Sequence, residues 1–258
     1  MTVTAYRTRK VTPGTRLYEL IDAVLPVVGE HDIVAVTSKI ISICEGNIIR
    51  NDGAVSKREL IKNQADAYLD GTAAARHNIL LTIKRNMLIA NAGIDESNGG
   101  GYCVLWPKAP QKSACDLWRY LRQTHKVKEI GVIITDSHTT PMRWGVTGVG
   151  LAWCGFDALK DYIGKPDIDG RKLHVTKANV LDGLSAAAVA VMGEGDEQTP
   201  LAVIRDASFV TFRGRPPTLR ELRSMIIDPA SDLYADLTDS PLWKKSASNG
   251  RSSIMDTE

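Results

Sequence analysis

The sequence lacks the features that would tie the protein to a membrane, to nucleic acid or to an oxidising compartment. Its longest apolar stretches are broken by charged residues, so we expect no segment to span a bilayer. A formal net charge of +2 gives no field strong enough to favour nucleic acid or an anionic membrane. The four cysteines are scattered without a CxxC pair, which favours a reduced, cytoplasmic protein. Residues 1–10 carry basic residues but no following apolar core, so we expect no signal peptide.

Several widespread catalytic motifs are absent as well. The chain has no Walker A loop, no GxGxxG, no HExxH and no GxSxG. Its five histidines do not cluster at metal-ligand spacing, and none is paired with a clear nucleophile. His138 is the one histidine worth following, although a histidine in such a place more often orients a loop.

The patterns that are present predict an α/β fold, mixed α+β in its layout. At 258 residues, the chain can bury one large core or form a main domain with an appendage. Short apolar runs predict strands at 33–36, 78–83, 87–90, 131–134, 172–176 and 201–204. Helical periodicity predicts helices at 17–25, 38–46, 59–69, 113–124, 181–192 and 215–227. We expect a main domain over 1–212, a packed helical extension over 213–245 and a frayed tail over 246–258.

The stretch after the strand at 131–134 is the strongest candidate for chemistry. This strand is β-branched and unbroken, so we expect it to be buried on both faces, as in a parallel sheet. It runs into Asp136 and Ser137, and Arg143 follows shortly after. Ligands bind outside the carboxyl ends of strands in open α/β sheets, and a carboxylate, a hydroxyl and a guanidinium suit a metal-bound phosphate. The alternative is an aspartate that only caps the following turn.

Two further polar loops follow regular elements. Residues 91–101 are rich in Gly, Asn and acids, and they include Asp95 and Asn98. An acidic loop around Glu194 to Asp196 follows the Ala-rich helix, whose carboxyl end carries negative partial charge. Oxygen side chains suit hard divalent cations, of which Mg²⁺ is usually held by few carboxylates plus substrate phosphates. A flexible glycine turn and a solvated acidic turn remain the alternatives.

Four ordered blocks carry a family resemblance: NAGIDESN, GVIITDS…RWG, DYIGKPD…GR.L.VT and MGEGDEQTPLAVIRD. Together they resemble the coenzyme F-420-0:γ-glutamyl ligase (CofE) family over roughly residues 8 to 212. The resemblance implies a CofE-like α/β fold that works as an intertwined homodimer. It also implies a ligase, dependent on GTP or ATP and on divalent metal ions, that joins L-glutamate to a cofactor-like carboxylate through an acyl phosphate.

The resemblance also assigns roles to individual positions. Asp95 and Asp136 match the ligands of one metal, and Ser137 and Glu194 match those of a second, with Ser137 where threonine is usual. The resemblance implies Mg²⁺ or Mn²⁺ as these metals and allows K⁺ as a further ion. Ser38 and Asn98 match nucleotide contacts. The matched nucleotide-binding loop comprises Met192, Gly193, Glu194, Gly195, Asp196, Glu197, Gln198 and Thr199. Arg143 is our own hypothesis for a phosphate or carboxylate clamp, from its place after the central strand.

Departures from the family weaken the choice of substrate more than the choice of reaction. Ile43 stands where the family usually has a nucleotide-contacting lysine. Lys39 could substitute on a helix, where the two positions would be roughly 6 Å apart, but not on a strand, at roughly 13 Å. SHTTPMRWG replaces a Gly-Arg turn, and Asp169 takes a site that is often aromatic. The chain thus resembles a divergent branch often labelled folate-metabolism γ-glutamate ligases.

Three hypotheses on function follow. The first is an active γ-glutamyl ligase whose acceptor is F-420-0, a folate or a small peptide acid. A pteridine acceptor could stack on Trp106, Trp144 or Trp153, although tryptophans more often pack a core. The second is a metal- and nucleotide-binding regulatory protein without ligase turnover, which the Ile43 change favours and the retained acids disfavour. The third is a ligase that uses a different amine.

Overall fold

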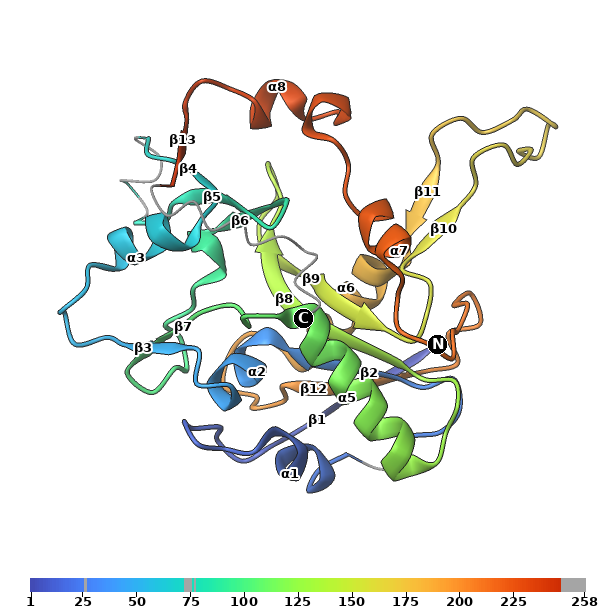
Figure 1. Cartoon of the computed structure of the whole chain (residues 1–258), viewed down its shortest axis with the longest axis horizontal. Helices are drawn as coiled ribbons and strands as arrows, with labels where there is room; N and C mark the ends of the chain where they lie inside the picture. The colour runs from blue at the N-terminus through green and yellow to red at the C-terminus, as the bar shows by residue number, and fades with distance from the viewer. Residues whose placement is uncertain (26, 72–75, 77, 247–258) are drawn as a thin grey trace.

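A five-stranded mixed sheet forms the centre of the computed structural model, which describes residues 1–25, 27–71, 76 and 78–246 (Figure 1). Its strand order is β1 (Thr2–Tyr6), β12 (Leu201–Arg205), β2 (Ile33–Thr37), β8 (Gly131–Thr139) and β9 (Val146–Cys154). In this sheet only β2 and β8 run parallel; every other neighbouring pair is antiparallel. The predicted α/β class is confirmed, and the sheet contains a single parallel pair.

Helices cover both faces of this sheet. One face packs against α1 (Leu17–Asp22), α2 (Ser38–Cys44) and α5 (Pro110–His125), and the other against α6 (Val180–Met192) and α7 (Leu219–Ser224). Successive strand residues alternate between the two cores, as the pleat requires. Val34, Val36, Val132 and Ile134 point to the first core, and Ile33, Ala35 and Ile133 to the second. All of them are buried, which confirms the prediction of a strand covered on both sides.

Glycines let α6 lie against β9. A Cβ at Gly148 would sit 2.2 Å from the Ser185 carbonyl oxygen, and one at Gly150 would sit 2.4 Å from Leu181 Cγ. No side chain fits at either distance, so the glycines set the separation between helix and strand. Because Met192 ends this helix, the close packing fixes where the acidic loop begins.

A smaller second sheet has the order β13 (Trp243–Lys245), β4 (Ala67–Leu69), β5 (Leu81–Lys84) and β6 (Met87–Ala90). The strands predicted at 78–83 and 87–90 form the hairpin of β5 and β6, which turns through Arg85 and Asn86 at positive φ. A separate core lies between α3 (Lys57–Gln64), the small sheet and the pair β3 (Ile48–Arg50) and β7 (Tyr102–Val104). The short 3₁₀ helix η1 (Asn91–Gly93) follows β6.

The strands β10 (Leu159–Asp161) and β11 (Lys177–Asn179) form an arm that projects from the body (Figure 1). The chain turns at its far end, where Asp167 Oδ1 accepts hydrogen bonds from the backbone of Asp169 and Arg171. The strand predicted at 172–176 is wrong. The strand instead spans Lys177–Asn179.

Other boundaries differ from prediction. β8 does not end before Asp136 but continues to Thr139, because it keeps pairing with β9 where β2 has stopped. The helix predicted at 59–69 ends at Gln64, and Ala67–Leu69 joins the small sheet. Strand β1 was not predicted.

The C-terminal extension is not helical throughout. It contains α7, η2 (Pro229–Ser231) and α8 (Ala235–Thr238), but it ends in the strand β13, which pairs with β4. The tail predicted for 246–258 lies almost wholly outside the described residues. Among the residues that are described, no helix is long and apolar enough to cross a membrane.

Candidate active site

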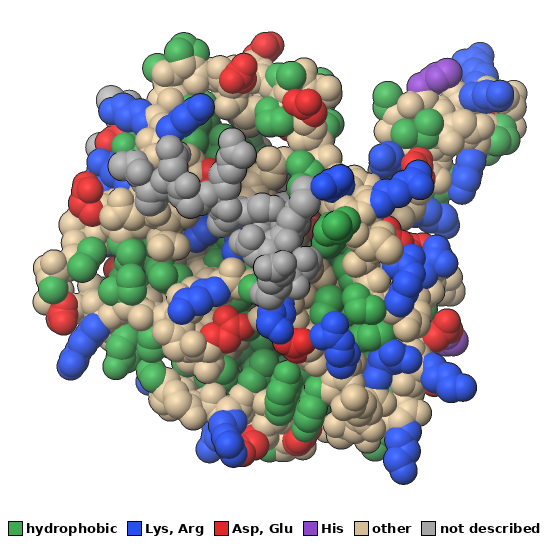
Figure 2. Space-filling view, viewed as in Figure 1, with side chains coloured by type: hydrophobic (Ala, Val, Ile, Leu, Met, Phe, Trp, Pro, Cys, Tyr) green, Lys and Arg blue, Asp and Glu red, His purple; other side chains and the backbone are tan. Residues whose placement is uncertain are grey.

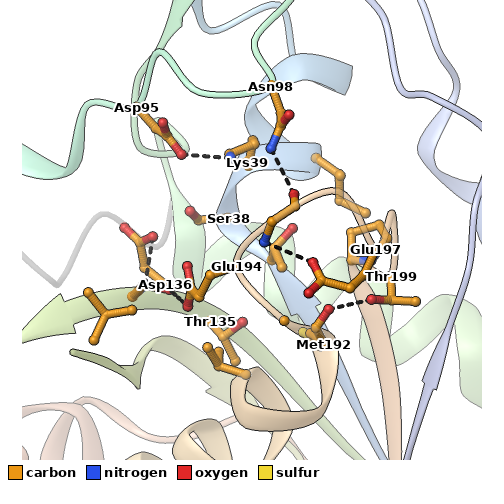
Figure 3. Close-up of a pocket in the computed structure, with 18 of the residues that line it drawn as sticks. Ser38, Lys39, Asp95, Asn98, Thr135, Asp136, Met192, Glu194, Glu197 and Thr199 are labelled. Carbon is orange, nitrogen blue, oxygen red and sulfur yellow. Dashed lines mark hydrogen bonds and ion pairs between the residues drawn. The ribbon is translucent and has the colours of Figure 1, made fainter.

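A cavity of about 470 Å³ opens at the carboxyl end of the parallel pair, where β2 stops and α2 begins (Figure 3). It gathers residues from parts of the chain that lie far apart in the sequence. The predicted site residues that line it are Ser38, Lys39, Asp95, Asn98, Asp136, Ser137 and all of 192–199. Ser38 is the first residue of α2, and its side chain makes no capping hydrogen bond there.

The open edge of β8 puts Asp136 and Ser137 in the cavity. The last β2–β8 pair joins Thr37 to Thr135, and beyond it β8 pairs only with β9. Successive side chains of a strand point to opposite faces. The Ser137 hydroxyl accordingly donates to Glu194 Oε1 at 2.6 Å on one side. Asp136 points to the other side, toward Trp106.

Asp136 lies in an environment that disfavours its charge. Burial, opposed by two hydrogen bonds, raises the pKa of this carboxyl to about 6, and the nearby charge of Asp95 adds to the effect. The two donors are the Ser137 backbone N–H, at 2.9 Å from Oδ1, and the Trp106 indole N–H, which donates to Oδ2. The indole comes this close because Gly93, at φ +70°, has no Cβ. A carboxyl with a pKa near 6 that faces a cavity suits a functional role.

Asp95 is held by a cation of the protein itself. Lys39 Nζ lies 2.6 Å from Asp95 Oδ2, and the Ser97 N–H and hydroxyl each donate to Oδ1 at 2.7 Å. Burial acts to raise the pKa of Asp95, but Lys39 and Ser97 together bring it below its ordinary value. Lys39 also donates to the Ser97 carbonyl at 3.2 Å, so it links α2 to the 95–98 loop.

The loop after α6 folds around one of its own acids. The Gly195 N–H donates to Glu197 Oε2 at 2.8 Å, and Gly193, at φ +80°, leaves room for that carboxylate. Thr199 donates to the Met192 carbonyl, which ties the two ends of the loop together. Asn98 Nδ2 donates to the Gly195 carbonyl at 3.1 Å and joins this loop to the one that carries Asp95 (Figure 3).

The oxygen donors in the cavity fit a hard divalent cation by their chemistry. Within the described part of the chain, however, no three acidic, histidine or cysteine side chains stand close enough to hold a metal ion. The acids of the cavity instead contact the protein's own groups. Lys39 neutralises Asp95, Trp106 and Ser137 bind Asp136, and Ser137 binds Glu194.

Comparison with known proteins places the chain in a family. The model of the F420-0:gamma-glutamyl ligase family matches residues 6–206. The chain belongs to this family. The coenzyme F420:L-glutamate ligase of Methanopyrus kandleri is 34% identical over 249 residues, covering 88% of this chain and 94% of the relative. Relatives with the same name are 31% identical in Methanocaldococcus jannaschii (72% of this chain, 80% of the relative) and 43% identical in Halobacterium salinarum R1 (50% of each).

The range matched by the F420-0:gamma-glutamyl ligase family model includes every predicted site residue, and the C-terminal extension lies outside it. Lys39 and Ile43 both line the cavity and lie on α2, so the helical alternative for this pair holds. Arg143 lies in the β8–β9 turn between the fully exposed side chains of Met142 and Trp144, and it does not line the cavity. Its role as a clamp remains a hypothesis.

Several residues that line the cavity were not predicted from the sequence. Thr8, Arg9 and Lys10 line it, and the Thr8 N–H donates to the Gln198 carbonyl at 2.9 Å. Recognition of β1 as a strand would have placed these basic residues at its end, next to the site. Trp106 was considered only for stacking, because no pattern in the sequence links its indole to Asp136.

Proposed function

We propose that the protein is a nucleotide-dependent γ-glutamyl ligase that joins L-glutamate to the carboxylate of an F420-0-type acceptor. The observation that carries this proposal is the convergence of α2, the 95–98 loop, the open edge of β8 and the 192–199 loop on one cavity. The names of the relatives support the same reaction. GTP is the nucleotide we favour over ATP, from the family resemblance.

In this proposal, Asp95 and Asp136 hold one divalent cation, and Ser137 and Glu194 hold a second. Mg²⁺ or Mn²⁺ bound there would neutralise charge on the transferring phosphoryl group. Asp136 must be ionised to act as a ligand, so with its pKa at about 6 it is ready near neutral pH. Lys39 and the basic residues at the end of β1 face the same space and would attract phosphates.

The chain's own groups hold the reactants in position. We expect the 193–199 loop and the Asn98 amide, which line the cavity, to orient the nucleotide. The acceptor carboxylate attacks the γ-phosphorus, the nucleoside diphosphate leaves, and an acyl phosphate forms. The amine of L-glutamate then attacks the acyl carbon and releases phosphate and a proton. Positioning and charge neutralisation account for most of the catalysis in such phosphoryl transfers.

We further propose a homodimer built on the β10–β11 arm. Figure 2 shows this arm standing clear of the body. Ile168 is 102% exposed and Val175 is 86% exposed, although apolar side chains at such positions are unfavourable in water. A second copy of the chain would cover them. Ile168→Asp with Val175→Asp should give a monomer in light scattering, whereas an unchanged mass would contradict this use of the arm.

Turnover of F420-0 with L-glutamate, GTP and Mg²⁺, followed by phosphate release and mass spectrometry, tests the main proposal. We expect a mass gain of one glutamyl unit that is lost in Asp136→Asn. Nucleotide binding without turnover on F420-0 would instead support the regulatory alternative. Arg143→Ala belongs in the same assay, and unchanged nucleotide and substrate turnover would reject the clamp.

A further inference from the structure

A second cavity, of about 280 Å³, lies beside the first along the β8–β9 hairpin, and its lining includes residues from both faces of the sheet. His138 lines both cavities, and its Nδ1 is 3.1 Å from the Thr147 carbonyl that fixes the ring. Trp106, which binds Asp136, forms part of the wall of the second cavity. A ligand that occupied this space would therefore end close to the carboxylate side of the first cavity.

The lining of the second cavity combines aromatic and apolar side chains with polar ones, among them Arg85, His138 and Asp182. Trp106 and Trp153 are each 3% exposed, and Leu88 adds apolar surface beside them. Arg85 and Asp182 also line the wall, so its charged groups are of both signs, and Arg85 Nη2 donates to the Lys108 carbonyl at 2.6 Å. Buried indoles bind flat rings well, whereas L-glutamate is small and polar and gains little from such a lining.

The size of the cavity limits how much of a ligand it can hold. Small-molecule sites usually measure about 300–1,000 Å³, so this cavity suits the ring end of a larger molecule. The remainder of that molecule would run past His138 toward the first cavity. A reaction between an acceptor carboxylate and a nucleotide needs two adjoining spaces of this kind.

One wall comes from the C-terminal extension, outside the residues that match the family model. Met225 and Ile227, which follow α7, line the cavity. Asn86 Nδ2 donates to the Ile227 carbonyl at 3.3 Å, so the extension is tied to the β5–β6 turn. The extension is therefore in contact with the cavity, although the family model itself ends at residue 206.

We infer that the second cavity binds the ring end of the acceptor, and that the C-terminal extension, by forming one of its walls, helps to determine which acceptor fits. This inference rests on the proposed ligase function. It assigns the deazaflavin ring of F420-0 to the space between Trp106 and Ile227, with the acidic tail of the acceptor directed past His138.

The test fills the cavity from two sides. In Ile227→Trp and Leu88→Trp, the KM for F420-0 should rise about tenfold or more, while the KM for GTP should change by less than about twofold. Leu233→Trp is the matched control, because Leu233 lies on the same extension, is 89% exposed and lines neither cavity. Equilibrium dialysis of F420-0, with a non-hydrolysable GTP analogue and Mg²⁺, measures acceptor binding without turnover and should show the same pattern.

The possible results distinguish a wrong assignment of the second cavity from a wrong ligase proposal. If the wild type turns over F420-0 and both tryptophan variants keep its KM and affinity, the cavity assignment is wrong and the ligase stands. If the wild type binds F420-0 without turnover, the ligase proposal fails while dialysis still tests the cavity. If the wild type does not bind F420-0 at all, the inference is overturned.

Discussion

The ion pair between Lys39 and Asp95 should weaken the binding of divalent cations in the absence of nucleotide. A cation that approaches Asp95 must first displace an ammonium group at 2.6 Å, and the other carboxylate oxygen is already bonded to Ser97. The two side chains are 28% and 41% exposed, so we place the pair between a buried charged contact and a surface salt bridge, at about 1.4 kcal/mol. This energy corresponds to about a tenfold change in affinity.

We therefore expect Lys39→Met to bind Mn²⁺ about tenfold more tightly than the wild type when no nucleotide is present. Electron paramagnetic resonance of free Mn²⁺ during a titration gives this affinity directly. With GTP present, the effect should shrink or reverse, because phosphates would draw Lys39 away from Asp95 in the wild type and so free the carboxylate. Lys39 would then couple metal binding to nucleotide binding.

The matched control is Lys10→Met. Lys10 lines the same cavity, so its removal changes the overall field by the same charge without breaking the Asp95 contact. Equal effects of the two variants would mean that only the general field matters. A Lys39→Met protein that binds nucleotide-free Mn²⁺ no more tightly than the wild type would refute the argument.

Three further predictions concern buried groups. Trp106→Phe removes a donor to the Asp136 carboxylate, so the pKa of Asp136 should rise above about 6. The pH midpoint of Mn²⁺ binding should then rise by about one unit. Circular dichroism should show that the fold of the variant is unchanged. Burial lowers the pKa of Lys84 to about 8, so the free energy of unfolding of the wild type should rise with pH between about 8 and 10.5. In urea unfolding, Lys84→Met should lack about 2 to 3 kcal/mol of that rise. If the free energies of unfolding of the two proteins change with pH in the same way, the prediction is wrong. Gly148→Ala should lower stability by about 2 kcal/mol or more, since its Cβ would meet the Ser185 carbonyl, and an unchanged melting temperature would show that α6 can move.

The sequence predicted those parts of the fold whose patterns are local. Ile33–Val36 and Gly131–Ile134 have unbroken apolar runs because helices cover both faces of the sheet there. The continuation of β8 through Asp136 was not predictable in this way. Beyond Thr135 the strand has an open edge on a cavity, so its side chains are polar although its backbone is still paired.

The candidate site was predictable to a similar extent. The three polar loops could be nominated from their oxygen side chains, and their order matched a family. The contact of Trp106 with Asp136 and the entry of Thr8 into the cavity depend on long-range packing. Neither follows from the residues adjacent to them in the chain. The position of Ile227 in the wall of the second cavity also depends on long-range packing.

The order of the strands has a consequence for synthesis on the ribosome. β12 lies between β1 and β2, and Thr2 pairs with Arg205, so the central sheet cannot close until that late strand has emerged. At about 5–20 residues per second, both early strands wait roughly ten seconds or more with unpaired edges. Such edges invite pairing with other chains. The nascent protein should therefore depend on chaperones more than its stability alone would indicate.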